Sequence, residues 1–303
     1  MKLLVTGAKG RLGQEVIKKA TKLPSIKQVF APSRQDLNLE DSQNVEEYFG
    51  SIQPTHVIHL AGYVYGIGGH HKRPLDSLKT AQMDLNLFNA IAKTPPQWIF
   101  YASSVAAYDQ KVQTLPLDES KFLLGEPSDS ESLYANVKRF AYTYLLNLKS
   151  SLGILFSYGL LTNLFGAQEK LLSEERHAIE ALIDKALKAR ETDSVLEVWG
   201  NPDDSRDFVS YSHAASVILN LLDLQTGPIN IASGTEISLS QLIQVFSESF
   251  GTNFNARYIP GPSSISRRVS SVVKLNELVP FTASYNPVVG LKEYISSRAL
   301  SGI

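Results

Sequence analysis

Cysteine is absent from all 303 residues of the chain. Disulfide bonds, thiolate metal sites and cysteine nucleophiles are therefore excluded, and acid–base chemistry must use other side chains. The chain also lacks an apolar run long enough to span a bilayer, and its first residues lack the basic and apolar segments of a secretory signal. We expect a cytoplasmic protein with no membrane partner and no metal site.

A strong excess of either charge is missing as well. The formal net charge is −1, which gives the molecule no general attraction to nucleic acid, so we expect no nucleic-acid partner. A local basic pocket that binds phosphates is still compatible with this balance. Because 43% of the residues are hydrophobic and 19% are charged, the chain can bury a sizeable core, and disorder is not expected.

The order of the predicted elements indicates an α/β fold. Short apolar segments at 2–6, 27–31, 56–61 and 98–103 are typical of strands, and longer segments with helical periodicity separate them. This alternation predicts a parallel sheet that is covered by helices on both faces. The segment 56–61 is almost entirely apolar, as expected for a central strand that is buried on both sides.

A glycine-rich turn joins the first predicted strand to the first predicted helix. Its three glycines have the spacing that permits a tight turn, close approach of a pyrophosphate, and packing of the helix against the sheet. The amino terminus of the helix adds backbone donors and a dipole that favours phosphate. The predicted dinucleotide-binding turn comprises Gly7, Lys9, Gly10, Arg11, Leu12 and Gly13.

The end of the second predicted strand favours NADP over NAD. A fold that prefers NAD usually has an acidic residue there, which binds the ribose hydroxyls. This chain has Ala-Pro-Ser-Arg at 31–34 instead, and Arg34 can hold a 2′-phosphate, with Lys9 and Arg11 nearby. We therefore predict NADP (NADPH) as the cofactor. The alternative is that these cations are ordinary solvated side chains.

Tyr134 and Lys138 are predicted to share one face of a helix at 133–148, because they are four residues apart. A lysine cation in this position would lower the tyrosine pKa from its usual value of about 10 and could hold the nicotinamide ribose. Such a tyrosine can donate a proton to a carbonyl as hydride arrives. The same spacing also occurs by chance in surface pairs, so the interpretation depends on the dinucleotide pattern that precedes it.

Two serines end the fourth predicted strand. The carboxyl ends of parallel strands form the ligand crevice of an open sheet, so a hydroxyl there can hydrogen-bond the substrate carbonyl. Ser104 is the predicted catalytic hydroxyl. Ser103 is either a substrate contact or a group that satisfies the backbone.

Together with the stretches Asn-Leu-Phe-Gly at 163–166 and Ser-Arg-Asp-Phe at 205–208, these features resemble the extended short-chain dehydrogenase/reductase family. The resemblance covers nearly the whole chain. Within the nucleotide-sugar branch it is greatest to the GDP-L-fucose synthases, which epimerise and then reduce GDP-4-keto-6-deoxymannose with NADPH. It implies a Rossmann-type, doubly wound parallel sheet with a smaller mixed α/β lobe that binds the substrate.

The change of pattern after residue 160 suggests how the chain is divided. Residues 1–160 and 205–232 are predicted to form the NADP-binding Rossmann domain, and a segment at its end, 228–232, is expected to be the last strand of the large sheet. Residues 161–204 and 233–303 are predicted to form the lobe that binds a nucleotide-diphosphate sugar.

The resemblance also implies roles for residues that the motifs above do not include. His177 would be an acid–base group or a sugar contact, and Asn163 would lie near the nicotinamide or the sugar. Lys185, Trp199 and Arg206 would hold the nucleotide diphosphate. The alternatives are that His177 caps a helix, that Trp199 belongs to the core and that Lys185 is a surface residue. Further cofactor contacts are expected from Asp36, Leu37, Leu60, Ala61, Gly62 and Leu164.

One departure from the family pattern bears on the reaction. The family enzymes use a cysteine shortly after the catalytic serine, together with the histidine, to exchange protons at the carbons beside the ketone. Val105 and Ala106 occupy the corresponding positions here, and methyl groups carry no exchangeable proton. We therefore expect epimerisation to be lost, reduced, or rerouted through His177, Tyr63 or Tyr65.

The resulting hypothesis is an NADPH-dependent reductase that delivers hydride to C4 of a nucleotide-linked 4-keto-6-deoxyhexose, with GDP favoured. A redox-neutral sugar epimerase that retains its cofactor is one alternative, and a non-catalytic NADP-binding sensor or scaffold is another. The family also leads us to expect a homodimer, in which helices near 76–93 and 133–148 form a four-helix bundle.

Overall fold

The computed structural model describes residues 1–109, 114–166, 178–261 and 265–301. Its largest feature is a six-stranded parallel sheet with the strand order β10-β5-β4-β3-β1-β2, which confirms the predicted fold class. The strand order reverses between β1 and β3, and open parallel sheets bind ligands at such a point, outside the carboxyl ends of the strands. The strands are β1 (Lys2–Thr6), β2 (Gln28–Phe30), β3 (His56–His59), β4 (Trp98–Ser104), β5 (Leu155–Leu161) and β10 (Gly227–Ile231).

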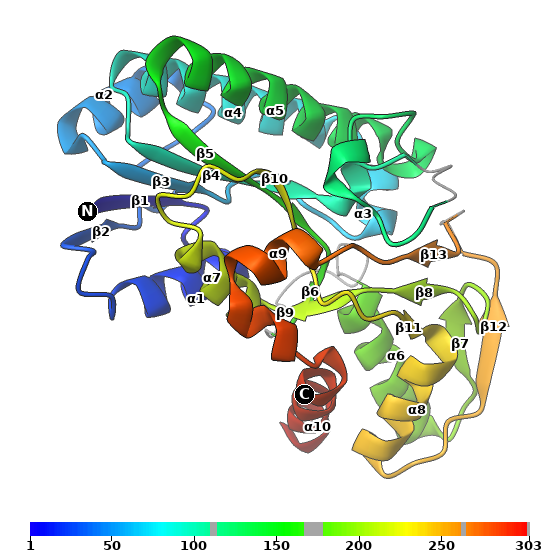
Figure 1. Cartoon of the computed structure of the whole chain (residues 1–303). Helices are drawn as coiled ribbons and strands as arrows, with labels where there is room; N and C mark the ends of the chain where they lie inside the picture. Colours follow the sequence, from blue (N-terminus) through cyan, green and yellow to red (C-terminus); the bar gives the residue numbers. More distant parts are fainter. Residues whose placement is uncertain (110–113, 167–177, 262–264, 302–303) are drawn as a thin grey trace.

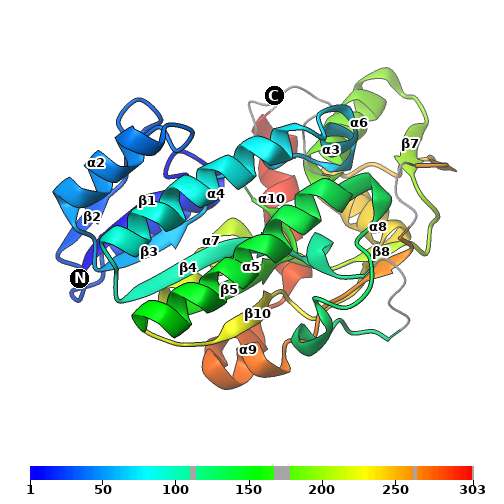
Figure 2. The ribbon, with the colours of Figure 1, turned by 90° about the horizontal axis from the view of Figure 1, so that it is seen from above.

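Helices cover both faces of this sheet (Figure 1). Successive residues of β1 point to opposite faces, so Leu4 packs in one core cluster while Leu3 and Val5 pack in the other. The first cluster lies under α2 (Ser42–Ile52), α4 (Asp76–Lys93) and α5 (Ser132–Leu152). The second lies under α1 (Arg11–Ala20), α7 (Tyr211–Asn220) and α9 (Val273–Leu278). Seen from above, α4 and α5 run side by side (Figure 2).

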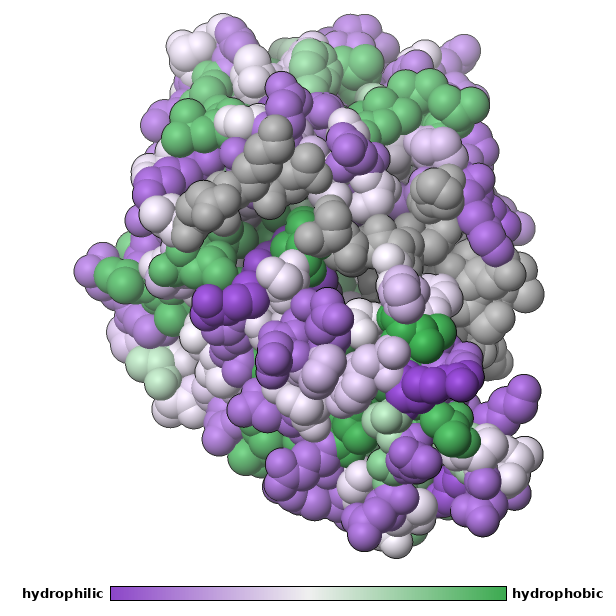
Figure 3. Space-filling model, turned by 90° about the vertical axis from the view of Figure 1, so that its right-hand side faces the viewer, coloured by the Kyte–Doolittle hydropathy of each residue, from purple (hydrophilic) through white to green (hydrophobic). Residues whose placement is uncertain are grey.

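A smaller mixed α/β region is built from later parts of the chain and has its own apolar cluster, which includes Phe165, Ile183 and Phe246. Its helices α8 and α10 pack against each other, and short two- and three-stranded sheets complete it. Figure 3 shows the side of the molecule to which β7, β8 and β12 belong, where hydrophilic and hydrophobic side chains are interspersed. The elements are β6 (Asn163–Phe165), α6 (Ala178–Thr192), β7 (Leu196–Trp199), β8 (Ser205–Arg206), β9 (Phe208–Ser210), β11 (Ile237–Ser238), α8 (Leu239–Phe250), β12 (Ala256–Ile259), β13 (Arg267–Arg268) and α10 (Pro287–Ser301).

Short helices complete the fold near the carboxyl ends of the large sheet. All six strands of that sheet fall within, or one residue beyond, the two segments predicted for the cofactor domain, whereas the division into two domains stays a prediction. Among the described residues, no helix has both the length and the apolar composition needed to cross a bilayer. The short helices are α3 (Ile67–Lys72), η1 (Val105–Ala107), η2 (Glu119–Lys121), η3 (Asp129–Glu131) and η4 (Pro280–Ser284).

Arg139 holds part of the polar segment that follows β4 against α5. Its guanidinium donates to the carbonyl oxygens of Ala107 at 2.8 Å, Gly125 at 2.8 Å and Leu124 at 3.0 Å. Leu117 also pairs with Ser270 in an isolated β-bridge, so the described part of this segment is attached at both ends. The segment ends in η3, which leads directly into α5 and the residues predicted to be catalytic.

Candidate active site

The glycine turn has the geometry that its spacing predicted. Gly7 has a φ of +68°, and a Cβ on it would lie 2.8 Å from the amide nitrogen of Ala61. A Cβ on Gly13 would lie 2.3 Å from the Gly7 carbonyl oxygen, so α1 can approach the turn this closely only with glycine at that position. The Gly10 amide donates to the Gly7 carbonyl at 2.9 Å, which closes the turn.

A cavity of about 260 Å³ opens beside this turn. The ends of β1, β2 and β3 form its walls, as expected for the crevice of an open parallel sheet. The tight cradle that a Cβ would fill, together with the backbone amides at the start of α1, fits the pyrophosphate and adenosine of a dinucleotide. The predicted cofactor contacts that line the cavity are Gly7, Lys9, Gly10, Arg34, Leu37, Ala61 and Gly62.

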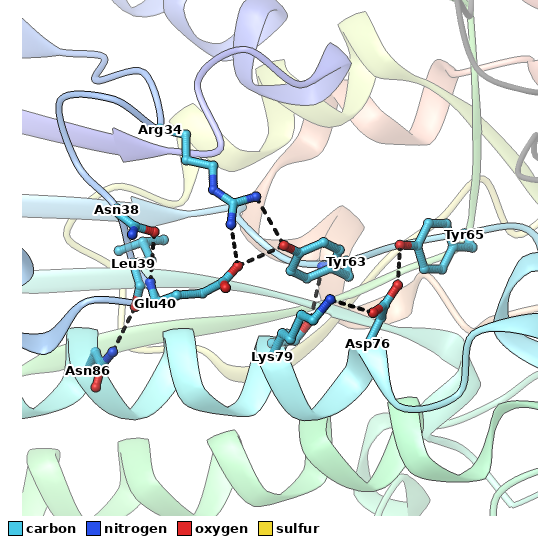
Figure 4. A network of polar contacts seen from close by, with 10 residues as sticks. Arg34, Asn38, Leu39, Glu40, Tyr63, Tyr65, Asp76, Lys79 and Asn86 are labelled. Carbon is cyan, nitrogen blue, oxygen red and sulfur yellow. Dashed lines mark hydrogen bonds and ion pairs between the residues drawn. The ribbon is translucent and has the colours of Figure 1, made fainter.

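Arg34 lies at this cavity, but it already has an anionic partner (Figure 4). Its guanidinium donates to the Glu40 carboxylate at 2.7 Å and to the Tyr63 hydroxyl at 3.1 Å. Tyr63 in turn donates to the same carboxylate oxygen at 2.7 Å. Sequence reasoning missed Glu40, although an acidic residue six positions after a proposed phosphate ligand was visible. A phosphate that binds Arg34 must therefore compete with Glu40.

Three other predicted cofactor residues do not line this cavity, and their contacts with a cofactor stay predictions. Arg11 donates to the Tyr211 hydroxyl of α7 at 2.9 Å. Asp36 is exposed and accepts hydrogen bonds from the amide and hydroxyl of Ser33, so its carboxylate holds a local turn. The Leu12 side chain packs in the core, which leaves its backbone as the part that can face a cofactor.

The three residues of the predicted reductive set meet at the carboxyl end of β4. Tyr134 and Lys138 lie on the buried face of α5, with 6% and 3% of their surfaces exposed. The Ser104 hydroxyl hydrogen-bonds the Tyr134 hydroxyl and also accepts from the Ala106 amide at 3.1 Å. A Cβ on Gly62 would lie 3.9 Å from Lys138 Nζ, so the lysine borders the wall of the cofactor cavity.

Ser103 is directed away from this cluster. Its hydroxyl donates to the Tyr158 hydroxyl at 2.7 Å, and Tyr158 donates to the backbone carbonyl of Lys138 at 2.8 Å. Ser103 is also buried. Successive strand residues face opposite sides, so Ser103 and Ser104 point away from each other, and a substrate contact by Ser103 stays a prediction.

The expected lowering of the Tyr134 pKa is also wrong for this arrangement. Burial raises the pKa of Tyr134, the charge of Glu131 adds to the increase, and the hydrogen bond with Ser104 opposes it. The Lys138 ammonium donates instead to the Tyr101 hydroxyl at 3.1 Å and lies 5.8 Å from the centre of the Tyr134 ring. A phenol in this environment keeps its proton at neutral pH, which suits a proton donor.

His70 is a neighbour of Tyr134 that the sequence reasoning did not identify. It is buried on α3, and its ring lies 4.4 Å from that of Tyr134 and 5.7 Å from that of Tyr65, centre to centre. Burial lowers the pKa of His70, so the imidazole is neutral at physiological pH. The signal available was a pair of histidines directly after a glycine-rich stretch at 66–69.

The predicted diphosphate ligands Lys185 and Trp199 lie together in the smaller region. Lys185 Nζ is 4.6 Å from the centre of the Trp199 ring, and 53% of the Trp199 surface is exposed. Trp199 is therefore not a core residue, and its exposed face can stack on a planar group. Asn163 donates to the Asp207 carbonyl at 2.9 Å, and Leu164 packs against the core, so their contacts with a cofactor stay predictions.

Arg206 has a second arginine beside it. Arg206 donates to the carbonyl oxygens of Ser266 at 3.0 Å and Ile265 at 2.7 Å, while burial and the charge of Arg268 lower its pKa to about 10. Arg268 contacts Glu131 at 3.3 Å, next to the start of α5. The sequence pattern did not identify Arg268, because it lies 62 positions after Arg206 on another strand. Two fixed cations near the reductive set suit a diphosphate.

The remaining candidates concern proton exchange. Val105 and Ala106 are buried directly after Ser104. The Tyr65 hydroxyl donates to Asp76 at 2.8 Å (Figure 4), and Tyr63 is engaged with Glu40. His177 lies outside the described residues, so its predicted role stays a prediction.

Comparisons with known proteins agree with this geometry. A model of the NAD dependent epimerase/dehydratase family matches residues 3–232. A GDP-L-fucose synthase of Sinorhizobium fredii is 27% identical over 80% of this chain and 78% of its own length. A GDP-L-colitose synthase of Yersinia pseudotuberculosis is 27% identical over 83% of this chain and 82% of its own length. The crystal structure of a GDP-L-fucose synthetase from Naegleria fowleri bound to NADP has a TM-score of 0.85 and 25% identity, and the match covers 99% of this chain and 92% of that one.

Proposed function

Because the chain belongs to the NAD dependent epimerase/dehydratase family, we propose that it is an NADPH-dependent reductase of a nucleotide-activated keto sugar. The observation that carries the proposal is the meeting of Ser104, Tyr134 and Lys138 at the end of β4, on the wall of the cofactor cavity. The names of the relatives, a GDP-L-fucose synthase and a GDP-L-colitose synthase, favour a GDP-linked substrate. Its sugar would be a 4-keto-6-deoxyhexose.

The residues of the glycine turn and of the cavity wall would hold NADP, which supplies hydride to a carbonyl carbon when it is bound in reduced form. Tyr134 donates its proton to the carbonyl oxygen, and its raised pKa keeps that proton in place until negative charge develops on the oxygen. Ser104 orients the oxygen through its hydroxyl. Lys138 provides positive charge beside the phenol and a donor for the nicotinamide ribose.

The smaller region would bind the nucleotide diphosphate. Arg206 and Arg268 present two cations at the boundary with the large sheet, which suits the two phosphates. Trp199 offers an exposed ring on which a base can stack, and Lys185 lies over the same ring.

We propose reduction without the two-site epimerisation of the related synthases. Val105 and Ala106 stand where an acid–base side chain would be needed, and both are apolar and buried. A redox-neutral epimerase would leave the amount of NADPH unchanged, so net consumption of the cofactor separates the two functions.

The direct test is to mix the purified protein with NADPH and GDP-4-keto-6-deoxymannose and to follow the absorbance of the reduced nicotinamide. We expect the absorbance to fall with time. Tyr134→Phe should reduce kcat by at least about 100-fold and leave NADPH affinity unchanged, because only the proton donor is removed. Tyr144→Phe, which removes an exposed hydroxyl from the same helix, is the matched control.

Two results would contradict the proposal: no NADPH oxidation with any nucleotide-linked keto sugar, or an unchanged rate in Tyr134→Phe. The same reaction in deuterated water tests epimerisation. Product without deuterium at C3 and C5 is expected, and deuterium at either carbon would show that protons are still exchanged.

A further inference from the structure

A continuous chain of hydrogen bonds runs inward from the catalytic lysine to the end of β1. Lys138 Nζ donates to the Tyr101 hydroxyl at 3.1 Å, and this hydroxyl donates to Asp84 Oδ2 at 2.5 Å. Asp84 Oδ1 lies 2.8 Å from His59 Nε2, and His59 Nδ1 lies 2.7 Å from the Thr6 hydroxyl. The chain therefore joins α5, β4, α4, β3 and β1 behind the reductive set.

The chemistry of the groups sets the direction of each bond. A carboxylate has no proton to donate, so Tyr101 and His59 Nε2 both donate to Asp84. His59 Nδ1 shares a hydrogen bond with the Thr6 hydroxyl, whose oxygen also accepts from the Ala61 amide at 3.4 Å. One phenolic hydroxyl therefore separates the lysine ammonium from the Asp84 carboxylate.

These two charges are removed from water. Asp84 is 2% exposed, Lys138 is 3% exposed, and Tyr101 between them is fully buried. Burial lowers the pKa of Lys138, and the charge of Asp84 is the influence that opposes this. Burial and the charge of Asp84 raise the pKa of Tyr101, so the bridging hydroxyl keeps its proton. A buried ammonium without a compensating anion would be costly.

The other titratable groups near Lys138 do not supply the negative charge that Asp84 supplies. Tyr134 of α5 and Tyr158 of β5 are buried phenols with raised pKa values, so they are neutral. His70 of α3 is neutral and has a pKa that the Lys138 charge lowers further. Glu131 of η3 faces Tyr134 and His70 but is already in contact with Arg268. Asp84 is thus the anion that the hydrogen-bond chain connects to Lys138.

We propose that Asp84 is the positioning residue that keeps the Lys138 ammonium charged and directed at the active site, acting through the Tyr101 hydroxyl. His59 and Thr6 hold the carboxylate in place from the side of the cofactor turn. The role of the charged lysine in turnover rests on the proposed reductase function. The charge state of the lysine does not, so it can be measured separately.

The chain contains a matched control on the same strand. At the other end of β3, His56 Nε2 lies 2.7 Å from Asp223 and His56 Nδ1 lies 2.8 Å from the Thr55 hydroxyl. This repeats the threonine–histidine–aspartate order, but the Asp223 side chain is 55% exposed and lies at the opposite end of β3 from the contact between His59 and Asp84. Asp223→Asn therefore alters a similar histidine–aspartate contact without touching the reductive set.

The first experiment measures the titration of Lys138 without using turnover. Protein labelled with ¹³C at the lysine Cε atoms is titrated by NMR, and Lys138→Arg identifies the signal. We expect Asp84→Asn to lower the pKa of Lys138 by at least about one unit relative to wild type, and Asp223→Asn to leave it unchanged. An unchanged Lys138 titration in a folded Asp84→Asn protein would overturn the proposal.

The second experiment follows kcat against pH. Because Lys138 must carry its proton, a lower lysine pKa moves the upper pH limit of activity downward, so Asp84→Asn should lose activity at high pH first. A merely structural role would lower the melting temperature and leave the pH profile in place. Tyr101→Phe should move the limit in the same direction, and the double variant should add little to Asp84→Asn. If Asp84→Asn does not fold, Tyr101→Phe is the test. An unchanged upper pH limit of activity together with an unchanged Lys138 titration would then overturn the proposal.

A wild-type protein that does not oxidise NADPH with any keto sugar would contradict the proposed function and leave the NMR comparison intact. A lysine titration that shifts as expected without a change in the pH profile would show that Asp84 holds the charge but that turnover does not need it, which overturns the positioning role.

Discussion

At the cofactor cavity, the Glu40 carboxylate forms an ion pair with Arg34, the residue that is best suited to bind a 2′-phosphate. Glu40 and the Arg34 guanidinium are 2.7 Å apart, and Tyr63 bridges them. The pair is partly exposed, with 67% of the Arg34 side chain and 29% of the Glu40 side chain accessible, so its own contribution to stability is small. Its consequence is for ligand affinity, since a bound phosphate would lie near a like charge.

We predict that Glu40→Gln raises the affinity for NADPH by about threefold to tenfold, because the amide leaves Arg34 free and removes the repulsion. The affinity for NADH, which has no 2′-phosphate, should change less. Arg34→Ala should weaken NADPH binding in the same titration. Fluorescence titrations at low salt measure both cofactors, and a gain for NADH equal to that for NADPH would contradict the explanation.

At the scale of elements, the contact between α1 and the glycine turn is a packing constraint. A Cβ on Gly13 would lie 2.3 Å from the Gly7 carbonyl oxygen and 2.9 Å from the Ala8 Cα atom, and both are backbone atoms that cannot rotate away. Any side chain at this position must push α1 away from β1.

Gly13→Ala is therefore expected to lower the free energy of unfolding by about 1–3 kcal/mol and to weaken NADPH binding at least tenfold. Gly50→Ala is the control, because Gly50 lies within α2 and a Cβ on it would meet nothing within 4 Å. It should raise the free energy of unfolding by about 0.5–1 kcal/mol. Urea unfolding of both variants measures the difference, and equal effects would show that the close approach is not a constraint.

The start of α7 shows how tertiary structure selects between two possible helix caps. Local sequence also allows Ser212 to cap a helix, whereas α7 starts at Tyr211 and its His213 amide donates to the Ser210 hydroxyl at 3.1 Å. Two serines two positions apart have the same local propensity for a cap. The strand β9 ends at Ser210, and this tertiary anchor selects the serine that precedes the helix.

At the scale of the whole molecule, several large apolar side chains of the neighbouring helices α4 and α5 are exposed. Leu78 of α4 and Phe140, Leu146 and Leu152 of α5 are all more than 40% exposed. Figure 2 shows the two helices side by side on the surface of the sheet. The homodimer stays a prediction, and in it these exposed side chains would be covered by a second copy of the chain.

Light scattering should therefore give a mass of twice the 33.4 kDa chain for the wild-type protein. Phe140→Glu places a charge in the paired face and should shift the mass towards that of one chain. Val289→Glu changes a similarly exposed residue on α10 and should leave the dimer intact. A wild-type monomer, or a Phe140→Glu dimer of unchanged affinity, would contradict the predicted interface.

Local pattern was enough to predict the sheet, the glycine turn, the family and the shared face of Tyr134 and Lys138. Alternation of apolar residues and a spacing of four on a helix are properties of consecutive residues, so they can be recognised without knowing which elements become neighbours. The same holds for the glycines, whose spacing reflects a turn within one short segment.

The partners of those residues depend on contacts between distant segments. Asp84 meets Lys138 through Tyr101, His70 meets Tyr134, and Arg268 lies beside Arg206. Nothing in their spacing along the chain indicates these contacts, because each pair joins separate elements. The pKa of Tyr134 shows the consequence. The lysine one helical turn away predicted a decrease, but burial in the folded protein and the charge of Glu131 produce an increase, and the ammonium donates to Tyr101 instead.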